Sequence, residues 1–250
     1  MMGPGKLLKQ IDELKREIDA FRPLNKHQLA QLKEYYRIGL TYSSNALEGN
    51  SLTEVETKIV IEEGITIGGK PLKDHYEAIG HSKAFDQLYE LAKGDTITEN
   101  DILTLHQFFY QTVDEKKAGK YRREQVIITG SEFIPPAADK VPSLMAAFTG
   151  QIAAQREKLH PVEFAAWLHL ELVTIHPFVD GNGRTARLLM NLALLQGGYM
   201  ITIIPPVVRN TYIETLQAAQ VKKDKQPFYD FISAMVYESA KDYLRLVRSL

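Results

Sequence analysis

The sequence predicts a mostly α-helical protein with one short β-hairpin. Apolar residues recur at helical spacing along most of the 250 residues, whereas a strand pattern appears only within residues 125–134. Residues 160–174 and 183–196 are apolar on nearly every side, which places both segments at the centre of a core. With no repeat, low-complexity segment or linker in the sequence, we expect one helical domain over residues 1–250.

Each helix is predicted from its periodicity and its end signals. Pro23 ends the first helix, and Gly49 ends the second because glycine accepts the left-handed conformation found at helix C-termini. Thr53 and Glu56 form a capping box at the start of the third helix. The predicted helices are residues 7–21, 25–47, 53–64, 73–91, 98–111, 141–156, 160–174, 183–196, 209–221 and 227–250.

The expected hairpin has strands at residues 126–129 and 132–134, joined at Gly130 and Ser131 and closed off by Pro135 and Pro136. An isolated hairpin is only marginally stable, so it must lean on the helices.

Composition excludes several classes of function. The net charge is −1, so we expect neither nucleic acid nor a membrane surface as a partner. The absence of cysteine excludes disulfides, thiolate metal sites and cysteine nucleophiles. No apolar run is long enough to span a bilayer and no signal peptide is evident, which favours a cytoplasmic enzyme or binding protein.

The residues with the most distinctive chemistry lie between the two central helices, in the stretch HPFVDGNGRTAR of residues 176–187. His176 is suited to act as a general base, and Asp180 to hold Mg²⁺ on phosphates. Gly181 and Gly183 would let a ligand approach the free N–H groups that open the next helix. Arg184 and Arg187 share a helix face and suit phosphate oxygens. Together these residues predict a site for a Mg²⁺-nucleotide beside a base; the simpler alternative is a helix corner with surface arginines.

This stretch matches, at every specified position, the signature HPFx[D/E]GNGRxxR of the Fic-family adenylyltransferases. The segments GKYR at 119–122, RNTY at 209–212 and LEGN at 47–50 are also similar to family features. The resemblance implies a Fic-like helical bundle in which the hairpin is a flap. It also implies an enzyme that transfers AMP from ATP to a Ser, Thr or Tyr hydroxyl of a protein, with ATP as substrate and Mg²⁺ as cofactor.

The resemblance further implies a role for each residue. His176 would take the proton from the target hydroxyl, and Asp180 would hold Mg²⁺. Phe178 would anchor the loop in the core. The nucleotide would be bound by Gly181, Asn182, Gly183, Arg184 and Arg187 at the phosphates and by Tyr212 at the base, and the flap residues Val126, Ile127, Ile128 and Thr129 would pair with an extended target segment.

A second family pattern, [ST]xxxE[GN], matches residues 44–49 within the N-terminal helices of residues 1–50. Ser44 and Glu48 are four residues apart and face the same way. The resemblance implies that Glu48 pairs with Arg187 and so removes the arginine that the γ-phosphate needs. The alternative is that Glu48 only ends a helix.

Three other functions remain open from the sequence. The same site could remove AMP from a modified protein, with Glu48 activating water, or it could transfer another nucleotide or phosphate-containing group. A protein that senses nucleotides without turnover is the non-enzymatic alternative, although binding alone does not require His176. The apolar stripe of residues 7–21 and other helical faces could support a homodimer.

Overall fold

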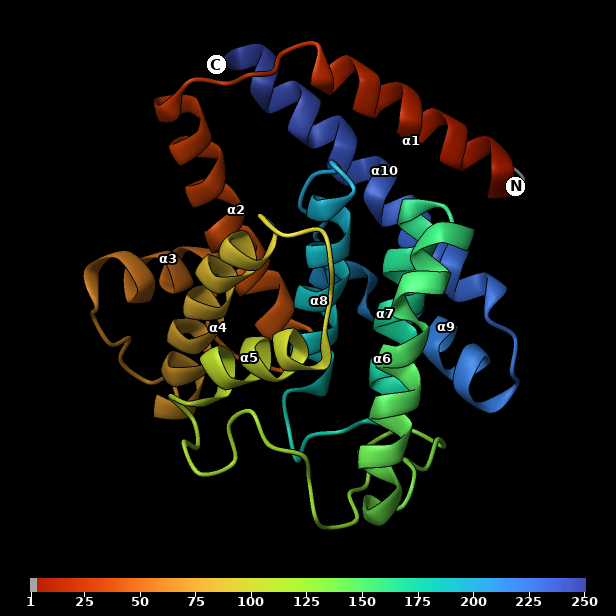
Figure 1. The fold of residues 1–250 in the computed structure, drawn as a ribbon. Helices are drawn as coiled ribbons and strands as arrows, with labels where there is room; N and C mark the ends of the chain where they lie inside the picture. Colours follow the sequence, from red (N-terminus) through yellow and green to blue (C-terminus); the bar gives the residue numbers. More distant parts are fainter. Residues whose placement is uncertain (1–3) are drawn as a thin grey trace.

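The computed structural model describes residues 4–250, which fold as a helical bundle (Figure 1). Every predicted helix is found, with ends within three residues of the predicted ones. The α-helices are α1 (Pro4–Asp19), α2 (Lys26–Ala46), α3 (Glu54–Glu63), α4 (Leu72–Leu91), α5 (Glu99–Tyr110), α6 (Val141–Lys158), α7 (Pro161–Ile175), α8 (Asn182–Gln196), α9 (Arg209–Val221) and α10 (Gln226–Ser249), with short 3₁₀ turns η1 (Ala138–Lys140) and η2 (Pro206–Val208).

The predicted helix ends form for the expected reasons. Thr53 caps α3, its side chain accepting from the Glu56 N–H while Glu56 reaches back to the Thr53 N–H. Gly49, just after α2, has φ of +93°, and Gly64, just after α3, has φ of +68°. These local signals therefore set where the helices begin and end.

The predicted hairpin is wrong, since no strand forms anywhere in residues 4–250. Residues 126–134 form an irregular loop with one turn, in which the Ser131 N–H donates to the Ile128 carbonyl at 3.1 Å. Ile127 is 89% exposed and Ile134 is 79% exposed, so neither side chain buries apolar surface. A two-stranded pairing without a buried face or a third strand gains too little to persist.

Helices α7 and α8 lie at the centre of the bundle, as their all-round apolar sequences predict. Helices α4 and α5 pack on α8 from one side, while α6 and α10 pack on α7 from the other (Figure 1). Helix α1 runs along α10, and α2 packs on α4. The fold thus brings the ends of α2, α7, α8 and α9 to one place. No helix in residues 4–250 is long and apolar enough to cross a membrane.

Gly80 tests how closely α4 and α5 approach each other. A Cβ at this position would overlap the backbone carbonyl of Phe109 and come within 2.5 Å of Thr112 Oγ1. We expect Gly80→Ala to lower the free energy of unfolding by about 1–3 kcal/mol, because backbone atoms must move. The matched control is Gly150→Ala at an exposed position of α6, where a Cβ would meet nothing within 4 Å. Because alanine has a higher helix propensity than glycine, this change should raise the free energy of unfolding by up to about 1 kcal/mol. Denaturant unfolding measures the free energy of unfolding of both variants. Equal changes in the two variants would contradict the close approach of α4 and α5.

Candidate active site

The site is built on the joint between α7 and α8. Pro177 disfavours helical geometry at the residue before it, and α7 stops at Ile175. His176 takes the left-handed conformation, with φ of +52° and ψ of +58°, which is costly for a residue other than glycine. Arg122 holds the joint in this shape: its Nε donates to the His176 carbonyl at 2.8 Å and its N–H to the Pro177 carbonyl at 2.9 Å.

The rest of the joint is clamped by Asn182 and His106. The Asn182 side chain bonds both the N–H and the carbonyl of Phe178 at 2.9 Å. The Phe178 ring is fully buried and stacks on His106, with ring centroids 3.7 Å apart, so Phe178 does anchor the loop. His106 Nδ1 accepts from the Gly119 N–H at 2.9 Å, which leaves Nε2–H to donate to the Asp180 carbonyl at 3.1 Å.

His176 is arranged as a base. Its Nδ1 lies 3.3 Å from the Val173 carbonyl, and because a carbonyl only accepts, Nδ1 carries the proton. Nε2 is then the basic nitrogen, and no group among residues 4–250 hydrogen-bonds to it. Burial lowers the pKa of His176, although the Val173 carbonyl opposes this, so the imidazole is neutral at neutral pH.

A pocket of about 220 Å³ opens beside His176. This volume is below the roughly 300–1,000 Å³ usual for ligand sites. One reason is that Glu48 reaches into the pocket from the turn after α2. The lining residues are Glu48, Ile128, Thr129, Gly130, Ser131, Val173, His176, Gly183, Arg209, Tyr212, Ile213, Leu216, Gln217 and Gln220. Of the predicted flap residues, Ile128 and Thr129 face the pocket, whereas Val126 and Ile127 do not line it.

The N-terminus of α8, at the edge of this pocket, has the free N–H groups that an anion would need. The backbone N–H groups of Asn182, Gly183 and Arg184 have no acceptor within residues 4–250, as expected for the first turn of a helix. The Asn182 side chain is committed to the loop, so its backbone N–H is the group left to contact a ligand. Gly181, with φ of +79°, makes the turn that opens the helix.

The two arginines of α8 point to different partners. Arg184 Nη1 lies 2.8 Å from a carboxylate oxygen of Glu77 on α4, and its Nη2 lies 3.1 Å from Asp180. Its guanidinium also lies over the Phe109 ring. Since only 4% of its side chain is exposed, Arg184 is already fixed in place by buried contacts.

Arg187 contacts the end of α2. Its Nε donates to Ser44 Oγ at 2.9 Å, and its Nη2 donates to the Ser44 carbonyl at 2.7 Å and to Glu48 Oε1 at 2.8 Å. Gly183 makes room for this contact, because a Cβ there would overlap Glu48 Oε1. Burial opposes ionisation of Glu48, but Arg187 and Arg184 outweigh it and lower the pKa of Glu48. Ser44 and Glu48 therefore lie on one side of α2 and both reach Arg187.

Tyr212 connects Arg187 to the core. Arg187 Nη1 donates to the Tyr212 hydroxyl at 3.3 Å, and this hydroxyl is hydrogen-bonded to His169 Nε2 at 2.9 Å. Tyr212 is 3% exposed and its ring forms part of the pocket wall, so it can contact a ligand through the ring only.

Asp180 has one oxygen that a cation could bind. Oδ1 accepts from the Gly181 N–H at 2.6 Å and from Arg184, while Oδ2 faces Lys73 at 3.5 Å. Burial opposes its ionisation, but Arg184 and the Gly181 N–H outweigh it and lower the pKa of Asp180. No group of three or more His, Asp or Glu residues able to hold a metal occurs within residues 4–250. Mg²⁺ on a nucleotide needs only one or two carboxylates besides phosphate oxygens and water, and Asp180 fits that role.

Sequence reasoning missed several residues of this site. Glu77 and Lys73 come from α4, Arg122 from the loop after α5, and Gln217 from α9. Glu77 and Lys73 lie about 100 residues from the signature stretch, and nothing in their local sequence links them to it. Arg122 belongs to the GKYR segment of residues 119–122, but this segment does not indicate what Arg122 does.

The buried His106 makes stability depend on pH. Burial lowers its pKa from 6.5 to about 4. Between pH 6.5 and about 4 the His106 imidazole is protonated in the unfolded chain but neutral in the folded protein. The free energy of unfolding therefore falls as the pH drops through this range. His106→Gln, whose amide can both donate and accept, should reduce the loss between pH 7.5 and 5 by about 2 kcal/mol.

Guanidinium chloride unfolding of the wild type and His106→Gln at the two pH values measures this difference. The control is His27→Gln on the exposed side of α2, which should leave the pH dependence unchanged. An equally steep pH dependence in wild type and His106→Gln would show that His106 does not resist protonation in the folded protein.

Comparison with known proteins agrees with this geometry. Residues 96–194, which include the whole signature stretch, match the Fic/DOC family. The chain is 35% identical over 241 residues to a protein adenylyltransferase Fic of Nematostella vectensis, covering 95% of this chain and 56% of that protein. It is 37% identical over 239 residues to the protein of that name in Drosophila mojavensis, covering 95% and 47%. The chain thus spans about half the length of the curated relatives it matches.

Solved structures have the same fold. A Fic domain containing signaling protein from Bacteroides thetaiotaomicron aligns with a TM-score of 0.88 and 28% identity, covering 96% of this chain and 97% of that one. Fic-1 from C. elegans aligns with a TM-score of 0.87 and 29% identity, covering 98% and 73%. The signature stretch, the helical bundle around α7 and α8, and these similarities lead to one conclusion: residues 96–194 of the chain form a domain of the Fic/DOC family.

Proposed function

We propose that this protein transfers AMP from ATP to a Ser, Thr or Tyr hydroxyl of a protein target, and that Glu48 restrains the reaction. The observation that carries the proposal is the placement of a neutral His176, with a free Nε2, beside the unoccupied N–H groups of α8. The names of the curated relatives, protein adenylyltransferase Fic, support the same activity.

In the proposed reaction the target oxygen attacks the α-phosphorus of ATP. A bond forms between this oxygen and the α-phosphorus, the bond from that phosphorus to the bridging oxygen of the β-phosphate breaks, and pyrophosphate leaves. The hydroxyl proton passes to His176 Nε2. The first turn of α8 and Arg184 would stabilise the charge on the α- and β-phosphates, since phosphoryl transfer is catalysed mainly by positioning and charge neutralisation.

Arg184 is prepared for this role by Glu77 and Asp180, which fix the guanidinium before any ligand arrives. Asp180 would hold Mg²⁺ through the oxygen that faces Lys73. When bound, Mg²⁺ would neutralise phosphate charge and orient the phosphates.

Residues 126–134 would present the target. Without strand pairing in residues 4–250, the backbone N–H and C=O groups of Ile127 and Thr129 have no partner among these residues and are free to pair with an extended segment. Ile128 and Thr129 line the pocket that contains His176, so a segment paired there would bring its hydroxyl towards Nε2.

Glu48 would restrain the enzyme by occupying Arg187. While Glu48 is paired with Arg187, this arginine would not be available to the γ-phosphate, and the Glu48 side chain would narrow the pocket beside His176. The pair is not fully buried: 2% of the Arg187 side chain but 37% of the Glu48 side chain is exposed. Breaking it should therefore cost less than the roughly 3–5 kcal/mol of a fully buried pair, which keeps the restraint reversible.

A second candidate function is removal of AMP from a modified protein. The lowered pKa of Glu48 makes its carboxylate ionised at neutral pH, and Glu48 lines the same pocket as His176. This carboxylate could activate a water molecule for attack on the phosphorus of a protein-bound AMP. Release of AMP that requires Glu48 would favour this reaction over transfer.

Glu48→Gly should activate transfer, because it frees Arg187 and enlarges the pocket. We expect at least a tenfold increase in the transfer of labelled AMP to the protein itself and to lysate proteins with ATP and Mg²⁺. The control is Glu34→Gly, which removes a carboxylate from α2 at a position away from the pocket. No activation by Glu48→Gly would exclude the restraint.

His176→Ala in the Glu48→Gly background should abolish transfer while leaving ATP binding within about threefold, because it removes the base and no phosphate contact. Labelling with radioactive ATP measures transfer, and calorimetry measures binding. Transfer that survives the substitution would rule out His176 as the base. ATP binding without transfer in both Glu48→Gly and the double variant would instead favour a nucleotide sensor.

A further inference from the structure

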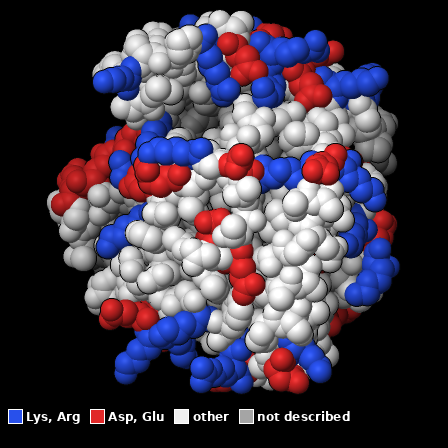
Figure 2. Space-filling model, in the orientation of Figure 1, with Lys and Arg blue, Asp and Glu red and all other residues white. Residues whose placement is uncertain are grey.

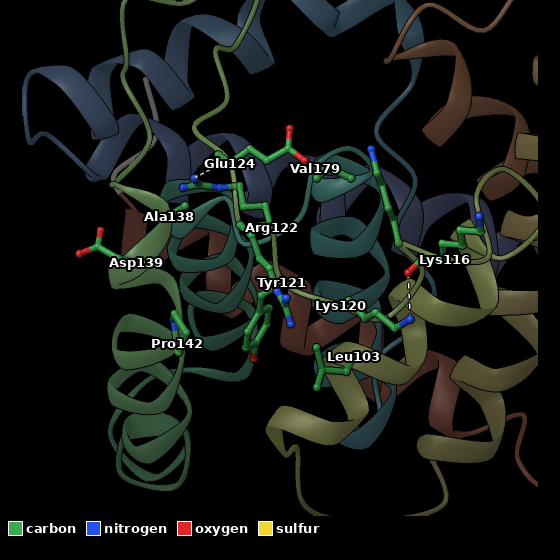
Figure 3. Close-up of a pocket in the computed structure, with 13 residues that line it drawn as sticks. Leu103, Lys116, Lys120, Tyr121, Arg122, Glu124, Ala138, Asp139, Pro142 and Val179 are labelled. Atoms are coloured by element: carbon green, nitrogen blue, oxygen red, sulfur yellow. Dashed lines mark hydrogen bonds between the residues drawn. The ribbon is translucent and has the colours of Figure 1, made fainter.

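A second cavity, larger than the pocket just considered, lies elsewhere in the described protein. It has a volume of about 840 Å³ and lies between the loop that follows α5 and the start of α6. Figure 3 shows Leu103, Lys116 and Lys120 on one side of it and Ala138, Asp139 and Pro142 on the other, with Tyr121 and Arg122 between them. We call it the basic cleft; its other lining residues are Lys117, Gly119, Arg123, Glu124 and Val179.

The lining of the basic cleft is positively charged, whereas the protein as a whole is almost neutral. Its lining contains five Lys or Arg residues against two acidic ones, in a chain whose net charge is −1. On the face drawn in Figure 2, basic side chains gather at the lower edge, where Figure 1 places the loop after α5. Lys116, Lys117, Lys120 and Arg123 are exposed, and none forms an ion pair within residues 4–250. Unpaired like charges side by side repel each other, and a bound anion would relieve this repulsion.

The chemistry of the cleft favours a chain of acidic residues over a small anion. The one buried cation, Arg122, already donates to the carbonyls of His176, Glu124 and Pro136. The remaining cations are long, exposed side chains spread around an open cavity, so no convergent set of buried donors exists for one phosphate or sulfate. Leu103, Pro142 and Val179 add apolar contact area of the kind a peptide can cover.

Nucleic acid fits the cleft less well than a peptide does. Its one aromatic lining residue is Tyr121, whose hydroxyl is bound to Glu99 at 2.6 Å and whose ring lies against Phe178. The ring is therefore not free to stack on a base, which single-stranded nucleic acid would require.

The cleft and the candidate active site are built in part on the same chain segments. Val179, in the loop that carries His176, forms part of its lining, and Arg122 links its wall to the carbonyls of His176 and Pro177. Glu124 lies at its edge, and four residues later Ile128 lines the pocket beside His176. A segment that follows this stretch of chain would run from the cleft to His176.

We propose that the basic cleft binds an acidic segment of the protein that is to be modified, next to the residue that receives AMP. Glu124 at the cleft and Ile128 at the pocket are four residues apart, so in an extended segment that runs beside them the acidic residues should lie at least about four residues from the modified hydroxyl. The proposal rests on the proposed transfer of AMP to a protein and adds the chemistry that selects the target.

The first test measures binding without any catalysis. Fluorescein-labelled hexaglutamate should bind the wild-type protein in 50 mM NaCl, bind more weakly in 300 mM NaCl, and bind more tightly than labelled hexaglutamine, as read by fluorescence anisotropy. Lys116→Glu/Lys117→Glu should weaken binding about tenfold, and Lys116→Gln/Lys117→Gln should weaken it less.

The matched control is Lys6→Glu/Lys9→Glu, which makes the same change in net charge on exposed positions of α1. This control should bind hexaglutamate like the wild type. Equal binding of hexaglutamate and hexaglutamine, equal loss in the control variant, or tighter binding of a six-nucleotide dT strand would each overturn the proposal. Circular dichroism and thermal unfolding verify that all variants are folded.

The second test uses the Glu48→Gly protein and peptides with one serine. A peptide with three glutamates placed six residues from the serine should accept AMP at least fivefold faster than one with three glutamines there, and Lys116→Glu/Lys117→Glu should remove the difference. Equal rates for the two peptides would overturn the proposal. Hexaglutamate binding without any AMP transfer to peptides or proteins would count against the proposed function alone, which keeps the two failures distinct.

Discussion

The structure depends on finding partners for one buried positive charge. Arg187 lies at the centre of the bundle with 2% of its side chain exposed, where an unpaired guanidinium would be very costly. Ser44 of α2, Glu48 in the turn after α2 and Tyr212 of α9 satisfy it, and the Tyr212 hydroxyl also contacts His169 of α7. A single side chain of α8 therefore ties together three other helices.

This arrangement places catalysis and restraint in the same hydrogen-bond network. The groups that stabilise Arg187 in the folded protein are the groups that keep it from a nucleotide under the proposed mechanism. Arg184, three residues earlier, is instead held by Glu77 and Asp180, which leaves it fixed whether or not Glu48 moves. The two arginines of the signature thus have separate physical roles: one is pre-positioned and the other is switchable. A pair with 37% of its carboxylate side chain exposed suits a switch, because water can replace the carboxylate at modest cost.

The joint at His176 shows how a strained backbone is stabilised from outside. Its left-handed conformation is held by Arg122, while Asn182 and the stacked pair of Phe178 and His106 fix the residues that follow. Arg122 also forms the wall of the basic cleft, so the segment that holds His176 in place is the segment we expect a target to touch. Under that proposal, target binding would be coupled to the geometry of the base through this residue.

The helices, their ends and the residues of the joint could be predicted from the sequence, because periodicity, proline, glycine and capping boxes act over a few residues. The long signature also indicated the family. The fold was needed to show that Glu77 and Lys73 reach the site and that Lys116, Lys117 and Arg123 gather around a cleft, because these contacts join segments far apart in the chain. The structure also shows that residues 125–134 form a loop: their run of β-branched residues is a local signal, whereas a strand needs a partner and a buried face that the bundle does not supply.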